Sequence, residues 1–237
     1  DYLYDENSKV KDRSYTRKLD LTNAIATTEF ETDKAKFHRE YFVSREADVA
    51  VIRLDADKSK MISVDINLNR QECVEYLTED NSIVMFGQLN DGSNGDEGMK
   101  YLSKLTVKND GGEVQYLDNK IVVRNADRLT LIFSSATNYK NENYVALVDD
   151  LMNEAKSQSY KALRKKHIET YQELFNRVEV DFGEGITDNH PINERLFDFQ
   201  DEDDPQLAEL YFQYGRYLLI SSTREDLLPP NLQGLSA

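Results

Sequence analysis

The chain has 237 residues, enough for one or two domains with a sizeable core. Its 44 acidic residues outnumber its 29 basic ones, and a net charge of −15 disfavours nucleic acid and anionic membranes while leaving neutral ligands such as sugars unopposed. No apolar run reaches the roughly 20 residues of a membrane span, and the lone Cys73 excludes an internal disulfide and a four-thiolate metal site.

The first 140 residues have the pattern of β-strands. Ile62–Leu68 alternates apolar and polar side chains, and Asn109-Asp110-Gly111-Gly112 is a strong turn signal between two strands. Because no helical period separates the strands, the connections must be antiparallel and the fold a β-sandwich. The predicted strands are 15–21, 24–31, 36–44, 49–56, 62–68, 73–77, 82–88, 101–108, 113–117, 120–125 and 129–134.

From about Asn141 the apolar period becomes helical. Two helices are predicted, with apolar faces at Val145, Val148, Leu151, Met152 and Ala155 and at Tyr160, Leu163, His167, Tyr171, Leu174 and Val178. Ser157 and Ser159 are candidate caps for the second helix. A short strand is predicted at 178–182, and the polar stretch 187–203 is predicted to be a connecting segment.

A last helix is predicted over residues 204–222. Asp204 is suited to the N-cap and Pro205 to the first helical position. Few residues between Leu207 and Ile220 are polar, so burial on nearly all sides is expected. Gly215 is costly inside a helix, which predicts close backbone contact with another element.

The C-terminal sequence carries a family resemblance. Leu210 to Ser222 followed by Leu228-Pro229-Pro230-Asn231-Leu232-Gln233-Gly234-Leu235 closely resembles glycoside hydrolase family 95, whose members are α-L-fucosidases and some α-L-galactosidases. The resemblance implies that this helix opens an (α/α)6 catalytic barrel, and hence that the chain is an N-terminal fragment. Ser236 stands where the family commonly has Trp.

Earlier segments resemble the same family. Tyr15–Leu21 and Arg39–Ser44 are similar to two of its sandwich strands, and Ser159–Val178 is similar to its linker. The resemblance implies three parts: an antiparallel β-(super)sandwich over 1–140 that lacks its first strands, a helical linker with a short strand over 141–192, and the truncated start of the barrel over 193–237.

Three groups of residues invite a functional interpretation. His38 and Glu40 flank Arg39, but neighbouring strand residues face opposite sides, which favours inter-strand pairing over a joint site. His167 lies on an apolar helix face and is expected to be a packing residue. The loop 90–98 is rich in oxygen ligands, but it lacks the EF-hand order, so a flexible acidic loop is favoured over a calcium site.

No catalytic pair is identified in this chain. Inverting glycoside hydrolysis needs an acid and a base roughly 6.5–9.5 Å apart, and the resemblance places them in the barrel, downstream of Ala237. Asn231 and Gln233 are the candidate substrate contacts. No metal or other cofactor is expected.

The sequence therefore predicts a fragment of a glycoside hydrolase that resembles α-L-fucosidases and removes terminal α-L-fucosyl residues with inversion. The alternatives are an α-L-galactosidase, a disaccharide phosphorylase of related architecture and a non-catalytic carbohydrate-binding or scaffold module. The expected partners are a fucosylated glycan, the remainder of the barrel and a second copy through 204–222. The resemblance implies a periplasmic or secreted protein, although the chain shows no signal peptide.

Overall fold

The computed structural model of the protein describes residues 10–11, 14–92, 98–117, 119–183, 190–199 and 204–225. The chain divides into two compact units, one of residues 1–19 with 25–167 and one of residues 20–24 with 168–237. The first unit contains the sheets, and the second contains the C-terminal helices.

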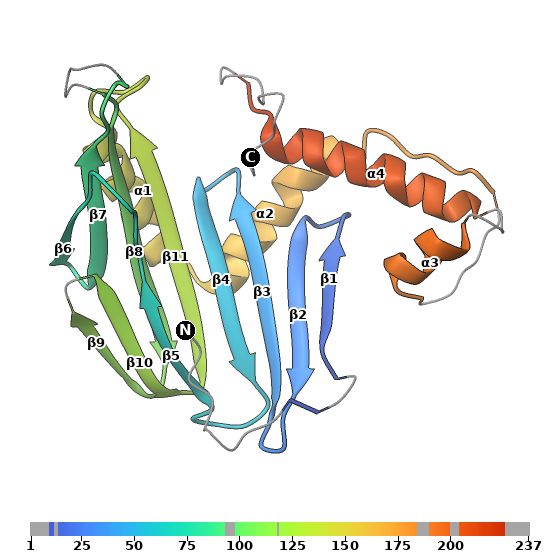
Figure 1. Cartoon of the computed structure of the whole chain (residues 1–237), viewed down its shortest axis with the longest axis horizontal. Coiled ribbons are helices and arrows are strands. Elements are labelled where there is room, and N and C mark those ends of the chain that lie inside the picture. Colours follow the sequence, from blue (N-terminus) through green and yellow to red (C-terminus); the bar gives the residue numbers. More distant parts are fainter. Residues whose placement is uncertain are drawn as a thin grey trace. The chain divides into compact units, whose positions relative to one another are not determined.

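The first unit is built on an eight-stranded sheet with the order β1-β2-β3-β4-β11-β8-β7-β6 (Figure 1). Every neighbouring pair from β2 to β6 in this order is antiparallel. The last strand in the sequence thus lies in the middle of the sheet. The strands are β1 (Thr16–Asp20), β2 (Ile25–Glu31), β3 (Lys36–Ser44), β4 (Val49–Ala56), β6 (Glu75–Glu79), β7 (Ser82–Gln88), β8 (Lys100–Asp110) and β11 (Arg128–Thr137).

A second sheet of three strands packs against one face of the first. It has the order β5-β10-β9, with β5 (Ile62–Asn67), β9 (Glu113–Leu117) and β10 (Lys120–Ala126), and both of its strand pairs are antiparallel. Alternate apolar residues of the two sheets, among them Leu54, Ile83, Ile121 and Leu129, form one buried cluster. The antiparallel sandwich predicted from the sequence is confirmed, and each of the predicted strands through residue 134 forms within a few residues of its expected bounds.

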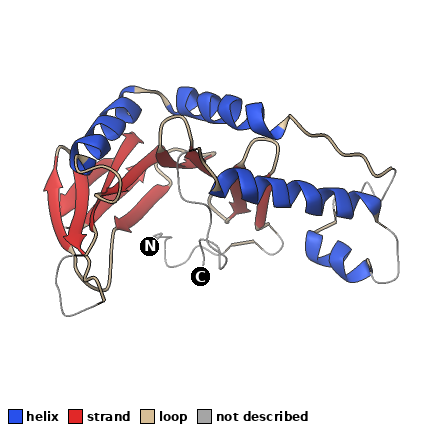
Figure 2. Ribbon diagram, turned by 90° about the horizontal axis from the view of Figure 1, so that it is seen from above, coloured by secondary structure: helices blue, strands red, loops and turns tan. Residues whose placement is uncertain are grey.

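Helix α1 (Tyr144–Ser157) covers the opposite face of the large sheet (Figure 2). Val148, Met152 and Ala155 are buried there, as the helical period predicts. Lys104 of β8 is also buried, and its Nζ donates to Asp149 at 2.8 Å and to Glu79 at 3.2 Å. Burial alone would lower the pKa of Lys104, but the bonds to both carboxylates raise it, so the lysine stays charged.

Helix α2 (Tyr160–Phe175) follows, capped by the Ser159 hydroxyl, which accepts from the Ala162 amide at 3.2 Å. The predicted strand at 178–182 is wrong, because these residues pair with no strand in the part of the chain that the structure describes. The polar stretch predicted as a connection also holds a short helix, α3 (Ile192–Asp198). Helix α4 (Pro205–Ser222) then forms as predicted. Within the described ranges no helix is long and apolar enough to cross a membrane.

Candidate functional site

The three consecutive residues His38, Arg39 and Glu40 of β3 lie on opposite faces of the sheet, as alternation predicts. The guanidinium of Arg39 lies 4.8 Å from the ring centre of Phe30 on the sandwich side. On the other side, His38 Nδ1 lies 2.9 Å from Glu29 Oε1, and its Nε2 lies 3.7 Å from Glu40 Oε1. The predicted inter-strand pairing is confirmed.

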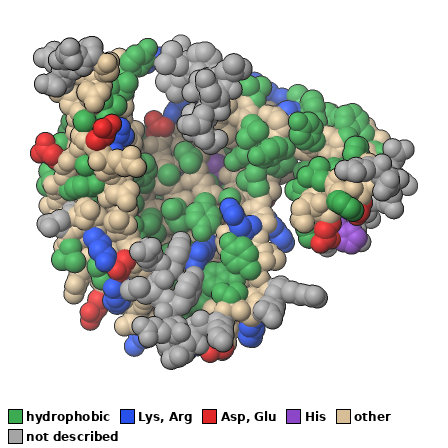
Figure 3. Space-filling model, viewed as in Figure 1, with side chains coloured by type: hydrophobic (Ala, Val, Ile, Leu, Met, Phe, Trp, Pro, Cys, Tyr) green, Lys and Arg blue, Asp and Glu red, His purple; other side chains and the backbone are tan. Residues whose placement is uncertain are grey.

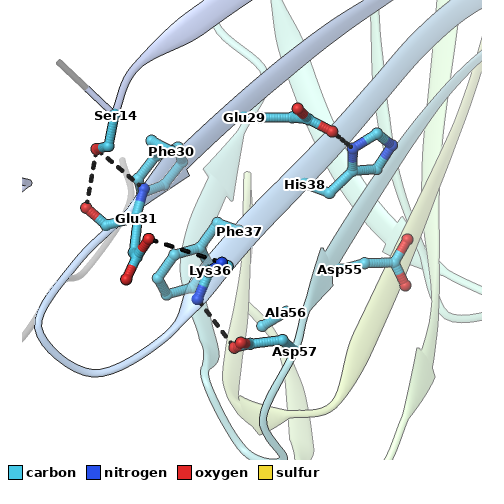
Figure 4. A pocket seen from close by; sticks show the side chains of 10 residues that line it. All are labelled: Ser14, Glu29, Phe30, Glu31, Lys36, Phe37, His38, Asp55, Ala56 and Asp57. Atoms are coloured by element: carbon cyan, nitrogen blue, oxygen red, sulfur yellow. Dashed lines mark hydrogen bonds and ion pairs between the residues drawn. The ribbon is translucent and has the colours of Figure 1, made fainter.

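A cavity of about 520 Å³ lies at the end of β2, β3 and β4 (Figure 4). Glu29, His38 and Asp55 form one row across the three strands, because they are direct partners in the sheet register. The lining residues are Ser14, Glu29, Phe30, Glu31, Lys36, Phe37, His38, Asp55, Ala56 and Asp57.

The carboxylates of this cavity are engaged with protein partners. Glu31 pairs with Lys11 and with Lys36, and the bond from Lys11 is the main cause that lowers the pKa of Glu31. Asp57 accepts from the Lys36 amide at 2.9 Å, and Asp55 pairs with Arg53 at 3.0 Å. These charged groups hold the strand ends together through ion pairs and hydrogen bonds. We therefore identify no catalytic acid and base pair in this cavity.

Glu40 ties β3 to the first turn of α2. Its carboxylate accepts from the Tyr160 hydroxyl and, at 3.1 and 3.4 Å, from the guanidinium of Arg164. Arg53 extends the network, because its guanidinium lies 5.1 Å from the Tyr160 ring centre and donates to Thr130 at 2.7 Å. The network is structural, since every one of these groups holds one element to another.

His167 is the packing residue that its helical position predicts. The side chain is buried, and its ring stacks on Phe42 with centres 4.7 Å apart. The acidic loop 90–98 falls largely outside the described residues, because 93–97 are not described. Among the residues that are described, no group of three His, Cys, Asp or Glu side chains could hold a metal ion.

The start of α4 is fixed by a buried ion pair that the sequence did not reveal. Asp204 is the predicted N-cap, and its Oδ1 accepts from the Leu207 amide at 3.0 Å. The same carboxylate accepts two further bonds from Arg195 of α3, each 2.9 Å long. Asp204 is only 2% exposed, so its carboxylate is shielded from solvent.

Arg216, in the middle of α4, binds the C-terminal end of α2. It donates to the carbonyls of Phe175 at 2.8 Å, Leu174 at 3.3 Å and Val178 at 3.0 Å. Its guanidinium also lies 4.9 Å from the Phe175 ring centre. Leu174 and Phe175 are the last residues of α2, and Val178 follows shortly after the helix, so the arginine caps the C-terminal end of α2 from another helix.

Aromatic rings surround this contact. Tyr171 of α2 stacks on Phe175 with centres 5.3 Å apart and meets Tyr217 of α4 edge-on at 6.4 Å. Burial raises the pKa of Tyr171 well above its usual range, and the nearby Tyr217 adds to the shift. The Tyr171 phenol therefore stays neutral and acts as a packing group.

The expected burial of α4 is wrong for this chain, because Leu207 is its one buried residue. Tyr211 is 78% exposed and Leu219 60% exposed, with Phe212, Tyr214 and Leu218 also open, and Figure 3 shows hydrophobic side chains gathered over this helix. Gly215 has open space where a Cβ would stand, so the predicted close contact is absent among the described residues. Both predictions assumed neighbours that the described residues do not supply.

The two candidate substrate contacts, Asn231 and Gln233, lie outside the described residues. Both follow α4 in the segment 226–237. Their role stays a prediction.

Comparison with protein families gives two matches along the chain. Residues 2–142 match the N-terminal domain of glycosyl hydrolase family 65. Residues 159–236 match the catalytic domain of glycosyl hydrolase family 95. The first match ends where the sheets end, the second begins at α2, and α1 lies between them.

Curated relatives match almost the whole chain. Alpha-L-fucosidase 2 of Arabidopsis thaliana is 30% identical over 263 residues, covering 96% of this chain and 31% of the relative. The protein named "Probable alpha-fucosidase A" of Aspergillus niger is 32% identical over 244 residues, covering 93% and 30%. The chain thus spans about a third of the length of these relatives.

A solved structure assigned as a kojibiose phosphorylase from human microbiome shares the fold, with a TM-score of 0.50 and 14% identity over 71% of this chain and 25% of that one. A β-sandwich followed by linker helices and the opening helix of an (α/α)6 barrel defines a class of glycoside hydrolases. The chain belongs to this class through its N-terminal domain of the glycosyl hydrolase family 65 type, which spans more than half of its residues. Its C-terminal part is similar to the catalytic domain of glycosyl hydrolase family 95.

Proposed function

We propose that this chain is the N-terminal part of an enzyme that hydrolyses terminal α-L-fucosyl residues of glycans with inversion. The observation that carries the proposal is the match of 93–96% of the chain to proteins named as fucosidases. The family 95 catalytic match over residues 159–236 supports the same reaction class. An α-L-galactosidase remains the alternative within the family.

The proposed organisation has three parts: the sandwich over 1–140, the helical linker over 141–192, and the start of the catalytic barrel over 193–237. The change from sheets to helices at α1 supports the first boundary. The family 95 match from residue 159 supports a catalytic domain that takes in the end of the linker.

The proposed acid and base are supplied by the barrel downstream of Ala237, and Asn231 and Gln233 contact the sugar. An inverting pair needs two carboxyl groups roughly 6.5–9.5 Å apart with a water molecule between them. The carboxylates of Glu40, Asp65 and Asp204 do not meet this need, because each is paired with arginine or lysine.

The apolar surface of α4 is proposed to pack against further helices of the longer protein. Its exposed rings and leucines support this proposal, since surfaces of this kind seldom stay open on monomers. The isolated chain is then expected to self-associate through 204–222. Light scattering on this chain and on a version ending at Gly183 tests this, and equal monomeric behaviour of both would contradict it.

The glycan substrate fits a periplasmic or secreted protein, and we propose this location together with the activity. The phosphorylase alternative gains nothing from the solved structure, because a likeness at 14% identity extends to the fold alone.

The test is an assay of two proteins side by side. This chain is expected to release no fucose from 2′-fucosyllactose or aryl fucosides, whereas the longer protein that contains it releases β-L-fucose first, as proton NMR of the anomeric signal can follow. Release of α-L-fucose would exclude inversion. Turnover by this chain, lost on substitution of one of its own carboxylates, would overturn the proposed placement of the acid and base.

A further inference from the structure

The only charged residue between Leu210 and Ser222 is Arg216, and its position needs an explanation. A charge in the middle of a largely apolar helix costs desolvation unless partners meet it. Arg216 meets partners outside α4: two carbonyls at the end of α2 and the Val178 carbonyl just beyond it. It also donates to the side chain of Gln213 on its own helix at 2.8 Å.

Arg177, just past the end of α2, donates to the Glu173 carbonyl at 2.9 Å, and Arg216 of α4 donates to the carbonyls that follow. No basic residue lies in its last turn, although a cation there would complement the helix dipole. Arg216 supplies the positive charge and the donors from α4 instead. The planar guanidinium also faces the Phe175 ring, a contact that a lysine ammonium would make less well.

We infer that Arg216 is a positioning residue that fixes the opening helix of the catalytic domain on the end of the linker helix. This inference rests on the proposed function, which places α4 at the start of the catalytic barrel; the family 95 match over residues 159–236 includes both helices. Three directed bonds from a planar group set both the distance and the rotation of α4 about its axis relative to α2. Apolar contacts between Tyr171 and Tyr217 would hold the two helices together without fixing that rotation.

The first test is hydrogen exchange on this 237-residue chain with Arg216→Gln and Arg216→Lys. The amides of Asn176 and Arg177 bond to carbonyls of the last turn of α2 at 2.9 and 3.4 Å, so they report fraying there. Their exchange should become faster by on the order of tenfold in R216Q and by less in R216K, because charge-assisted bonds are lost. Amides of β4 and β11 serve as the internal reference and should not change.

Arg177→Gln is the matched control. It removes a guanidinium from the same helix end, but one that bonds to its own helix at the Glu173 carbonyl, at 2.9 Å. Exchange in this control should stay within about twofold of the original chain, as for an exposed surface substitution. An equal acceleration in R177Q and R216Q, or none in R216Q, would overturn the inference.

The second test uses the longer enzyme. If Arg216 positions the catalytic domain, R216Q should lower kcat on an aryl fucoside by on the order of tenfold or more with the melting of the sandwich unchanged. R216K should recover part of the loss. Unchanged kcat in R216Q would show that the contact holds the helices without positioning the site, and so would refute the inference. If the longer enzyme without substitutions has no fucosidase activity, the proposed function is wrong. The hydrogen-exchange result for R216Q then decides the role of Arg216.

Discussion

Replacing Asp204 by alanine should selectively unfold the start of α4. The carboxylate has two tasks in one place: it caps the Leu207 amide at 3.0 Å, and it receives two 2.9 Å bonds from Arg195. Alanine removes the cap and leaves the Arg195 side chain, which is only 12% exposed, without its counter-charge.

The expected cost is the sum of these two losses. Losing an N-cap costs about 1 kcal/mol. Breaking a buried pair costs about 3–5 kcal/mol, and the lower end applies here because Arg195 can turn toward water. Asp204→Ala should therefore destabilise the α3–α4 region by about 4 kcal/mol. Asp204→Asn keeps an acceptor for the Leu207 amide, so it should cost less.

The assay is helicity by circular dichroism during thermal unfolding, with hydrogen exchange at Leu207 and Ala208. Arg195→Met completes a double-mutant cycle, which isolates the coupling between the two side chains. The reasoning is refuted if Asp204→Ala, Asp204→Asn and Arg195→Met all stay within about 0.5 kcal/mol of the original chain, the range of ordinary surface substitutions.

Three further predictions concern the first unit. Glu40→Gln and Arg164→Met should show a coupling of roughly 1 kcal/mol in urea unfolding, because the pair joins β3 to α2 but is partly exposed; additivity of the two substitutions would contradict this. The hydrogen bond from Lys120, and after it that from Arg124, lowers the pKa of Asp65 below its ordinary value of 3.8. The ionised Asp65 therefore stabilises the fold above pH 3.8, and this stabilisation is lost as the pH falls through the lowered pKa. Asp65→Asn should therefore flatten the acid limb of the stability curve, and an unchanged limb would count against it. Ile132→Ala should lower the free energy of unfolding, measured by denaturant titration, by about 2–5 kcal/mol, because the side chain is fully buried on the strand between β4 and β8. A loss under about 1 kcal/mol would show that the neighbouring side chains close the cavity, contrary to this expectation.

The sandwich could be predicted from the sequence because its signals are local. Alternation in segments such as Ile62–Asn67 fixes both the strand and its buried face, and Gly111 and Gly112, both with φ of 69°, form the predicted turn between β8 and β9. The N-cap at Asp204 was equally local. What the residues alone could not give was the order of strands across the sheet, which depends on pairings between distant segments.

The misses share a physical cause. Residues 178–182 alternate like a strand, but a strand needs a partner, and the described residues provide none. The α3 helix lacks buried residues, so no apolar period marked it. The interhelical roles of Arg195 and Arg216 depend on which helix ends lie beside them, which a one-dimensional pattern does not contain. The proposed sugar contacts came from family resemblance rather than from any physical signal in their neighbourhood.

The place of β11 in the large sheet has a consequence for how the protein is made. β1 to β4 and β6 to β8 each pair with their neighbours in the chain, but β4 and β8 meet only through β11, which reaches as far as Thr137. During synthesis the two halves must therefore wait with open edges at β4 and β8 until that strand leaves the ribosome. Formation of the large sheet should be slow, since Leu54 pairs with Leu129, a residue far from it in the sequence. A nascent chain stalled before Arg128 is thus the species that a chaperone would most need to protect.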